Sequence, residues 1–143
     1  MARFSKDTTI DAPADKVFAY VADFPRHSEW AQHNLEVMQT SSGTVGVGST
    51  FSTVGHQFGT QRESQTVVDY SPGTRFAFES KGGLGVTLNA FDLAPADGGT
   101  RLTKSLDFVH PSLLARVTSF MVGRQVPKFL EEDLRRIKQR VEA

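Results

Sequence analysis

The spacing of apolar residues changes along this chain, and the changes predict its order of elements. Alternation of apolar and polar positions predicts a first strand over residues 4–10. Helical spacing follows, because Val17 and Val21 fall on one side of a helix. Alternation returns from residue 35, and helical spacing returns after Pro111. The predicted order is a strand, a short helical block, a block of strands and a C-terminal helix.

Two Asp-x-Pro triplets, at residues 11–13 and 23–25, mark the helical block. Proline fits a first helical position, because its missing N–H would be unpaired there. Phe24 precedes a proline and is therefore driven out of the helical region, so the first helix stops near it. The second proline then starts another short helical segment that runs to Trp30. The sequence predicts two short helices in succession.

Six further strands are predicted after the helical block. They cover Leu35–Gln39, Ser49–Phe58, Gln61–Tyr70, Thr74–Ser80, Leu84–Leu93 and Arg101–Val109. Glycine-containing turns separate them, and Pro72-Gly73 suits the central pair of a type II turn. The connections are short, so neighbouring strands are expected to pair antiparallel.

The segment after Pro111 predicts one long helix with two apolar stripes. The stripes are Leu113, Val117, Phe120 and Met121, and then Leu130, Leu134, Ile137 and Val141. Gly123 and Pro127 lie between the stripes and are expected to kink or briefly break the helix. This order of elements predicts an α+β fold, in which a curved seven-stranded antiparallel sheet surrounds the long helix. The two short helices would close one end of a cavity.

The composition fits one globular domain over residues 1–143. The absence of cysteine excludes disulfides, thiolate metal sites and cysteine nucleophiles. Sixteen basic residues balance sixteen acidic ones, so no overall field favours nucleic acid or an anionic membrane. Neither an apolar leader nor a stretch long enough to span a membrane is present, so we expect a cytoplasmic protein without integral membrane association.

Motifs for metal or phosphate chemistry are weak. Gly43–Thr50 lacks the lysine of a phosphate-binding loop and is followed by alternation, not by a helix. His27, Glu29 and His33 cluster around Trp30 without the ligand spacing of a zinc site, and we expect these histidines in a solvated loop. No metal and no cofactor is predicted.

Polar residues that fall on the apolar side of a predicted strand say more about a possible binding site. Lys104 shares one side of its predicted strand with Leu102 and Leu106. A buried cation needs a partner, because leaving its charge unpaired costs several kcal/mol. One hypothesis is that Arg62 and Lys104 hold a ligand carboxylate or another anionic head group, with Asn89 adding a hydrogen bond. The alternative, favoured for each residue taken singly, is that a bulge or strand end turns it to solvent.

Short motifs along the whole chain carry a family resemblance. They are Ile10-Asp11-Ala12-Pro13 before Val17-Phe18, Asp23-Phe24-Pro25 before Trp30, Gly46-Val47-Gly48, Ser71-Pro72-Gly73 before Phe76, Phe91-Asp92-Leu93, and Gly98-Gly99-Thr100-Arg101-Leu102. On these residues the chain resembles the START-like (SRPBCC) superfamily, in particular its polyketide cyclase/dehydrase branch. The resemblance implies the helix-grip (Bet v 1/START-like) fold around a cavity for apolar ligands such as lipids or polyketides. It also implies that some members are cyclases.

The resemblance indicates which residues would line that cavity. Short helices cap the opening in the family, which places Trp30 at the mouth. Aromatic residues at strand spacing belong to the core first and to a pocket second. The predicted ligand-binding residues are Trp30, Phe51, Arg62, Phe76, Phe78, Asn89, Lys104, Phe108 and Phe120.

Three functions remain open from the sequence. The favoured one is binding or carriage of a small hydrophobic molecule, and an apolar cavity with one polar anchor would support it. The second is a polyketide cyclase- or dehydratase-type enzyme, and convergence of His56, Arg62 and Lys104 on one cavity would support it. His56 and His110 are otherwise expected at the surface near strand ends. The third is a protein-interaction module with a filled core.

Overall fold

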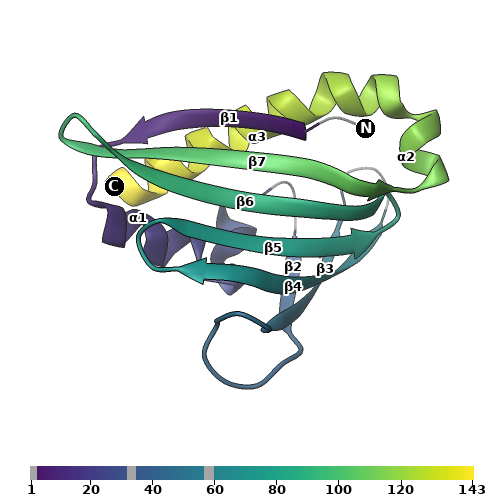
Figure 1. Ribbon diagram of the computed structural model, residues 1–143, viewed down its shortest axis with the longest axis horizontal. Coiled ribbons are helices and arrows are strands. Elements are labelled where there is room, and N and C mark those ends of the chain that lie inside the picture. The colour runs from purple at the N-terminus through teal and green to yellow at the C-terminus, as the bar shows by residue number, and fades with distance from the viewer. Residues whose placement is uncertain (1–2, 32–34, 57–59) are drawn as a thin grey trace.

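The computed structural model describes residues 3–31, 35–56 and 60–143, and it confirms the predicted order of elements (Figure 1). The strands are β1 (Arg3–Ile10), β2 (Glu36–Gln39), β3 (Thr50–Gly55), β4 (Gln61–Ser71), β5 (Arg75–Gly82), β6 (Gly85–Ala96) and β7 (Gly99–Pro111). The helices are α1 (Ala14–Val21), the 3-10 helix η1 (Phe24–Glu29), α2 (Leu113–Val117) and α3 (Ser119–Glu142). Residues 57 and 58, in the strand predicted up to Phe58, lie outside the described residues.

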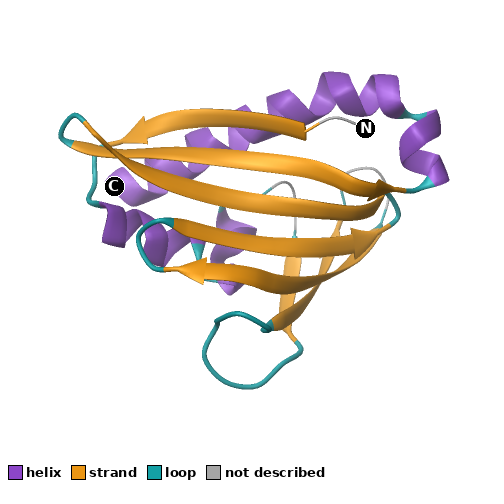
Figure 2. Cartoon of the chain, viewed as in Figure 1, coloured by secondary structure: helices purple, strands orange, loops and turns teal. Residues whose placement is uncertain are grey.

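The seven strands form one antiparallel sheet in the order β1-β7-β6-β5-β4-β3-β2. Strands β2 to β7 are neighbours in chain order, as their short connections predict. β1 instead pairs with β7 at the far edge, so α1 and η1 carry the chain from one edge of the sheet to the other. The helices all lie on one face of the curved sheet (Figure 2). Register shifts in β4 and β6 mark bulges, which add local bend and twist.

Helix α1 begins one residue later than predicted. Pro13 caps it, with an extended ψ of 156°. Asp15 lies in its first turn, where the helix dipole favours a carboxylate. The second short segment is a 3-10 helix with Pro25 in its first turn, as the second Asp-x-Pro triplet indicates. The Pro72-Gly73 turn also agrees with its prediction, because Gly73 has the positive φ, 78°, that a type II turn requires.

The long C-terminal helix differs from its prediction in where it is interrupted. Helix α3 is continuous through Gly123 and Pro127, and the break falls earlier, at Thr118. The Thr118 hydroxyl donates to the Leu114 carbonyl at 2.7 Å and closes the last turn of α2. Pro127 leaves the Gly123 carbonyl without its helical donor. Because Gly123 is exposed, that carbonyl can face water and the helix continues.

The second apolar stripe of α3 packs into the cup, and the first does not. Leu130, Leu134, Ile137 and Val141 are all buried. They belong to two apolar clusters, a large one around Phe24, Phe51, Phe76 and Phe91 and a small one of Phe108, Val126 and Leu130. The first stripe lies on the surface, and the expectation that Phe120 approaches the interior is wrong: its side chain is 75% exposed. The break at Thr118 turns α2 away from the sheet, so this stripe has no core to cover.

Candidate ligand-binding cavity

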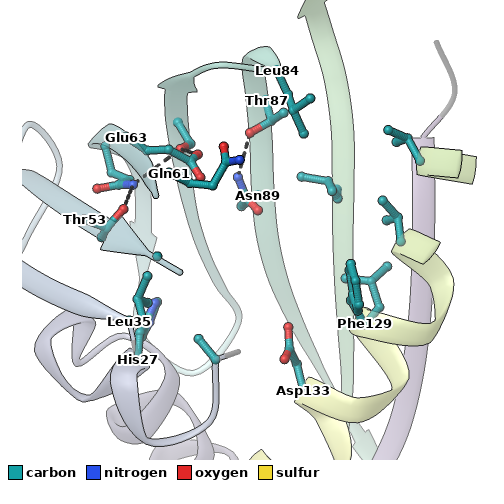
Figure 3. Close-up of a pocket in the computed structure, with 18 of the residues that line it drawn as sticks. His27, Leu35, Thr53, Gln61, Glu63, Leu84, Thr87, Asn89, Phe129 and Asp133 are labelled. Atoms are coloured by element: carbon teal, nitrogen blue, oxygen red, sulfur yellow. Dashed lines mark hydrogen bonds between the residues drawn. The ribbon is translucent and has the colours of Figure 1, made fainter. Parts of the chain in front are cut away.

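A cavity of about 510 Å³ lies between the sheet and helix α3. Its lining combines residues of both apolar clusters with inward-facing residues of strands β3 to β7. Figure 3 shows the two sides: Glu63, Thr53 and Asn89 stand on the strands, and Phe129 and Asp133 stand on α3. The interior is therefore not filled, which removes the basis of the interaction-module alternative.

One wall of the cavity is apolar. It is formed by Leu84, Leu106, Phe108, Val122, Val126 and Leu130. Leu106 and Phe108 share the inward side of β7, and the other residues reach the cavity from the turn before β6 and from α3. Phe4 contacts Phe108 edge to face at 6.1 Å between ring centroids and supports this wall from β1.

The wall formed by strands β3 to β5 is polar and internally bonded. The Gln65 amide N–H donates to Thr53 Oγ1 at 2.7 Å and to Ser80 Oγ at 3.4 Å. The Ser80 hydroxyl in turn donates to Glu63 Oε2 at 2.7 Å. A serine hydroxyl has one proton, so giving it to Glu63 leaves Ser80 to accept from Gln65. That order fixes the orientation of the Gln65 amide, and its buried Oε1 has no partner in the described part of the chain.

Lys104 lines the cavity, as one hypothesis held and against the solvent-facing alternative favoured for it singly. Its charge is already paired. Its Nζ lies 2.9 Å from Asp133 Oδ2, and the two side chains are only 11% and 8% exposed. The other oxygen of Asp133 accepts from Arg136 Nη2 at 3.0 Å. The Lys104 ammonium also lies 4.9 Å from the centroid of the Trp30 ring, within cation–π distance. The partner that a buried lysine requires is a carboxylate of α3, more than twenty residues away in sequence.

His27 is the main site residue that the sequence interpretation misplaced. Its side chain is buried, not in a solvated loop, and its Nε2 lies 2.7 Å from the Val21 carbonyl. A carbonyl only accepts, so Nε2 carries the proton. Burial, which outweighs the Val21 hydrogen bond, lowers the pKa of His27 to about 3, and the ring is neutral. The missed signal is its spacing: Phe24, His27 and Trp30 are three residues apart, and side chains at i and i+3 share one side of a 3-10 helix.

The predicted ligand-binding residues divide into those that line the cavity and those that do not. Trp30, Phe78, Asn89, Lys104 and Phe108 line it. Phe51 and Phe76 are fully buried in the core but are not part of the lining. Arg62 and Phe120 are exposed and are not part of it.

The placement of Arg62 in the cavity is wrong, because the inward side of β4 carries the other set of alternating residues. Gln61, Glu63 and Gln65 line the cavity, whereas Arg62 faces solvent. Both sets are polar, so hydrophobicity could not choose between them. Each set also contains one valine, and only the structure shows that Val67 is buried at 1% exposed whereas Val68 is 44% exposed.

The positions of the remaining histidines bear on the metal and enzyme alternatives. His56 lines the cavity, with its Nε2 at 3.1 Å from Glu36 Oε2 and its side chain 40% exposed. His110 is exposed on β7, and His33 lies outside the described residues. Within residues 3–31, 35–56 and 60–143, no group of three or more potential metal ligands is found. Of the three residues whose convergence would favour an enzyme, His56 and Lys104 line the cavity and Arg62 does not.

The sequence matches, over residues 1–142, the family described as polyketide cyclase / dehydrase and lipid transport. The chain belongs to this family. No curated protein matches it.

Solved structures confirm the helix-grip fold. The Zhui aromatase/cyclase from Streptomyces sp. R1128 is 16% identical with a TM-score of 0.81, over 99% of this chain and 93% of that one. TTHA0849 from Thermus thermophilus is 16% identical with a TM-score of 0.76, over 98% and 97%. Protein CV1439 from Chromobacterium violaceum is 13% identical with a TM-score of 0.75, over 100% and 99%. At these identities the similarity establishes the fold alone.

Proposed function

We propose that this member of the family binds a small, largely hydrophobic molecule in the cavity between the sheet and α3. The observation that carries the proposal is a cavity of about 510 Å³ with one continuous apolar wall. Cavities for small molecules usually measure about 300–1,000 Å³ and combine apolar walls with a few polar groups. A ligand that displaces water from such a wall is stabilised by roughly 25 cal/mol per Å² of apolar surface buried.

The charges around the cavity favour a ligand without an anionic group. Lys104 is neutralised by Asp133, His27 is neutral at physiological pH, and Glu63 contributes a carboxylate to the polar wall. Arg62, the second cation expected to hold a carboxylate, faces solvent. An anion entering the cavity would therefore meet a carboxylate and a lysine that already has its partner. An uncharged hydroxyl or carbonyl would meet the amides and hydroxyls of Asn89 and Thr87 at lower desolvation cost.

Ligand binding is tested first by native mass spectrometry of the purified protein, with organic extraction of any bound molecule. Affinity is then compared for decanol and decanoate, which share a chain length and differ in charge. We expect decanol to bind more tightly, and tighter binding of decanoate would contradict the charge argument.

A cavity-filling variant locates the site. Leu106→Trp should abolish decanol binding, because the indole would occupy the apolar wall. Val68→Trp places the same ring on the outer side of β4, where Val68 is 44% exposed, and should leave binding unchanged. Equal binding by both variants would show that the ligand does not occupy this cavity.

A second candidate is an enzyme that acts on the same bound molecule. What favours it is Glu63, a carboxylate in the cavity wall whose Oε2 accepts a hydrogen bond from the Ser80 hydroxyl at 2.7 Å. Such a group could accept a proton from a substrate. Incubating the protein with its extracted ligand, or with a linear polyketone, tests for turnover. Glu63→Gln should abolish conversion while binding persists, and unchanged conversion would remove Glu63 from the reaction.

A further inference from the structure

The large exposed apolar side chains concentrate at one corner of the molecule. Leu113, Leu114, Val117, Phe120 and Met121 are 77%, 56%, 75%, 75% and 55% exposed. These five residues, the apolar corner, belong to α2 and the first turn of α3. In Figure 1 this part of the chain lies at the end of the molecule opposite the C-terminus, beyond the strands. Contiguous exposed apolar surface of this kind usually marks an interaction site.

The charged residues of the segment that carries the apolar corner have one sign. No acidic residue lies between Asp107 and Glu131, whereas Arg116, Arg124 and Lys128 occur there and are exposed. None of these three cations has an ion-pair partner within the described parts of the chain. The balanced net charge of the whole protein therefore conceals a local excess of positive charge beside its most exposed apolar residues.

A surface recess of about 330 Å³ joins the two features. Phe120, Met121, Arg124, Gln125 and Lys128 line it. Arg124 and Lys128 are four residues apart on α3 and lie on one side of the helix. The Arg124 guanidinium stands 5.6 Å from the centroid of the Phe120 ring. The recess thus offers two cations and an aromatic ring to the same occupant.

We propose that the apolar corner docks on the surface of an anionic lipid bilayer. Apolar side chains beside basic ones match the boundary between acyl chains and negatively charged headgroups. Docking would be peripheral, because no helix in the described residues is long and apolar enough to cross a membrane. A second copy of the chain fits this corner less well. A symmetric contact would bring Arg116, Arg124 and Lys128 against the same cations of the copy.

The docked corner would adjoin the cavity. Met121 belongs to the apolar corner and also lines the cavity, together with Thr118 and Gln125. Docking would therefore bring one rim of the cavity to the lipid surface. The proposal does not depend on what the cavity binds, and its test uses no cavity ligand.

The test is sedimentation of the full chain with lipid vesicles at low salt. Vesicles of phosphatidylcholine alone are compared with vesicles of equimolar phosphatidylcholine and phosphatidylserine. The apolar variant is Val117→Ser with Phe120→Ser, and its control is Val47→Ser, a valine that is 69% exposed elsewhere. The charge variant is Arg124→Gln with Lys128→Gln, and its control is Lys16→Gln with Lys81→Gln, two exposed lysines on other elements.

We expect the wild-type protein to bind the mixed vesicles and to lose binding as salt is raised. A basic residue at an anionic surface contributes about a fivefold change in partitioning, so the charge variant should bind about thirty-fold more weakly. The apolar variant should lose binding, and both controls should keep it. The proposal is overturned if wild-type protein does not bind the mixed vesicles, or if controls and corner variants bind alike. It is also overturned if the protein forms a dimer that the apolar variant dissolves while no vesicle is bound.

Discussion

The ion pair between Lys104 and Asp133 gives the sharpest stability prediction. Asp133→Leu removes the only carboxylate that contacts Lys104 among the described residues, and it leaves the ammonium facing the Trp30 and Phe91 rings. Lys104→Met has a milder consequence, because Asp133 keeps its hydrogen bond from Arg136 at 3.0 Å. The two single variants should therefore differ in cost although they remove the same pair.

The magnitudes follow from the burial of the pair. Removing one partner of a buried ion pair typically costs about 3–5 kcal/mol, and we expect this for Asp133→Leu. Lys104→Met loses one charged hydrogen bond whose acceptor stays satisfied, so roughly 1–3 kcal/mol is expected. The double variant replaces both charges by apolar side chains, and its free energy of unfolding should lie within about 1–2 kcal/mol of that of wild type. Arg136 retains Glu132 and the Trp30 carbonyl as partners in that variant.

Urea unfolding of wild type, both single variants and the double variant measures these differences as a double-mutant cycle. Thermal unfolding should place Asp133→Leu roughly 10–15 °C below wild type. The reasoning fails if Lys104→Met costs as much as Asp133→Leu, or if the double variant is less stable than both single variants. Either result would mean that the pair is not isolated from water as its exposure indicates.

Three further predictions concern a buried titrating group, the core and the backbone. His27 titrates at about 3 when folded and near 6.5 when unfolded, so the unfolded state binds more protons between these values. The contribution of His27 to the free energy of unfolding should be fully present above pH 6.5 and should fall toward pH 3 by up to about 1.4 kcal/mol per pH unit. Urea unfolding at several pH values measures this, and the free energy of unfolding of His27→Gln should depend less steeply on pH. Ile137→Ala should lower the free energy of unfolding by about 2–5 kcal/mol, whereas Leu113→Ala, at 77% exposure, should change it by less than about 0.5 kcal/mol. Gly85→Ala would place its Cβ 2.1 Å from a backbone oxygen, at a residue whose φ is +97°. Thermal melts should therefore show a loss of stability beyond the roughly 1–3 kcal/mol that backbone strain alone costs. The control Gly46→Ala meets no atom within 4 Å and should melt near wild type.

The elements of this fold could be predicted because local chemistry decides them. The two Asp-x-Pro triplets set where α1 and η1 begin, since proline restricts both its own φ and the residue before it. Strong alternation and glycine-containing turns located the strands. The break in the C-terminal helix could not be located in the same way. Gly123 and Pro127 have the right chemistry for a break, but α3 continues through both, and the residues that follow, such as Leu130, are buried in the core.

The candidate site was predictable only where hydrophobicity identifies the inner side of an element. The hypothesis that Lys104 faces the cavity agrees with the lining, because its strand neighbours on the same side are apolar. Arg62 was placed on the wrong side because β4 is polar on both sides, so a shift of one residue carries no penalty that the sequence displays. His27 was missed because a histidine in a short proline-started segment is usually solvated, and only the packing of η1 against the sheet buries it.

The sequence by itself determined the order of elements, the class of fold and the family, because these depend on periodicity, turn chemistry and short motifs. Only the tertiary structure decided that Asp133 neutralises Lys104, that Glu63 and Gln65 face the cavity, and that the apolar residues of α2 remain on the surface. Each of these depends on segments far apart in the chain. Charge pairing and burial arise when such segments meet, and no local pattern specifies which segments will do so.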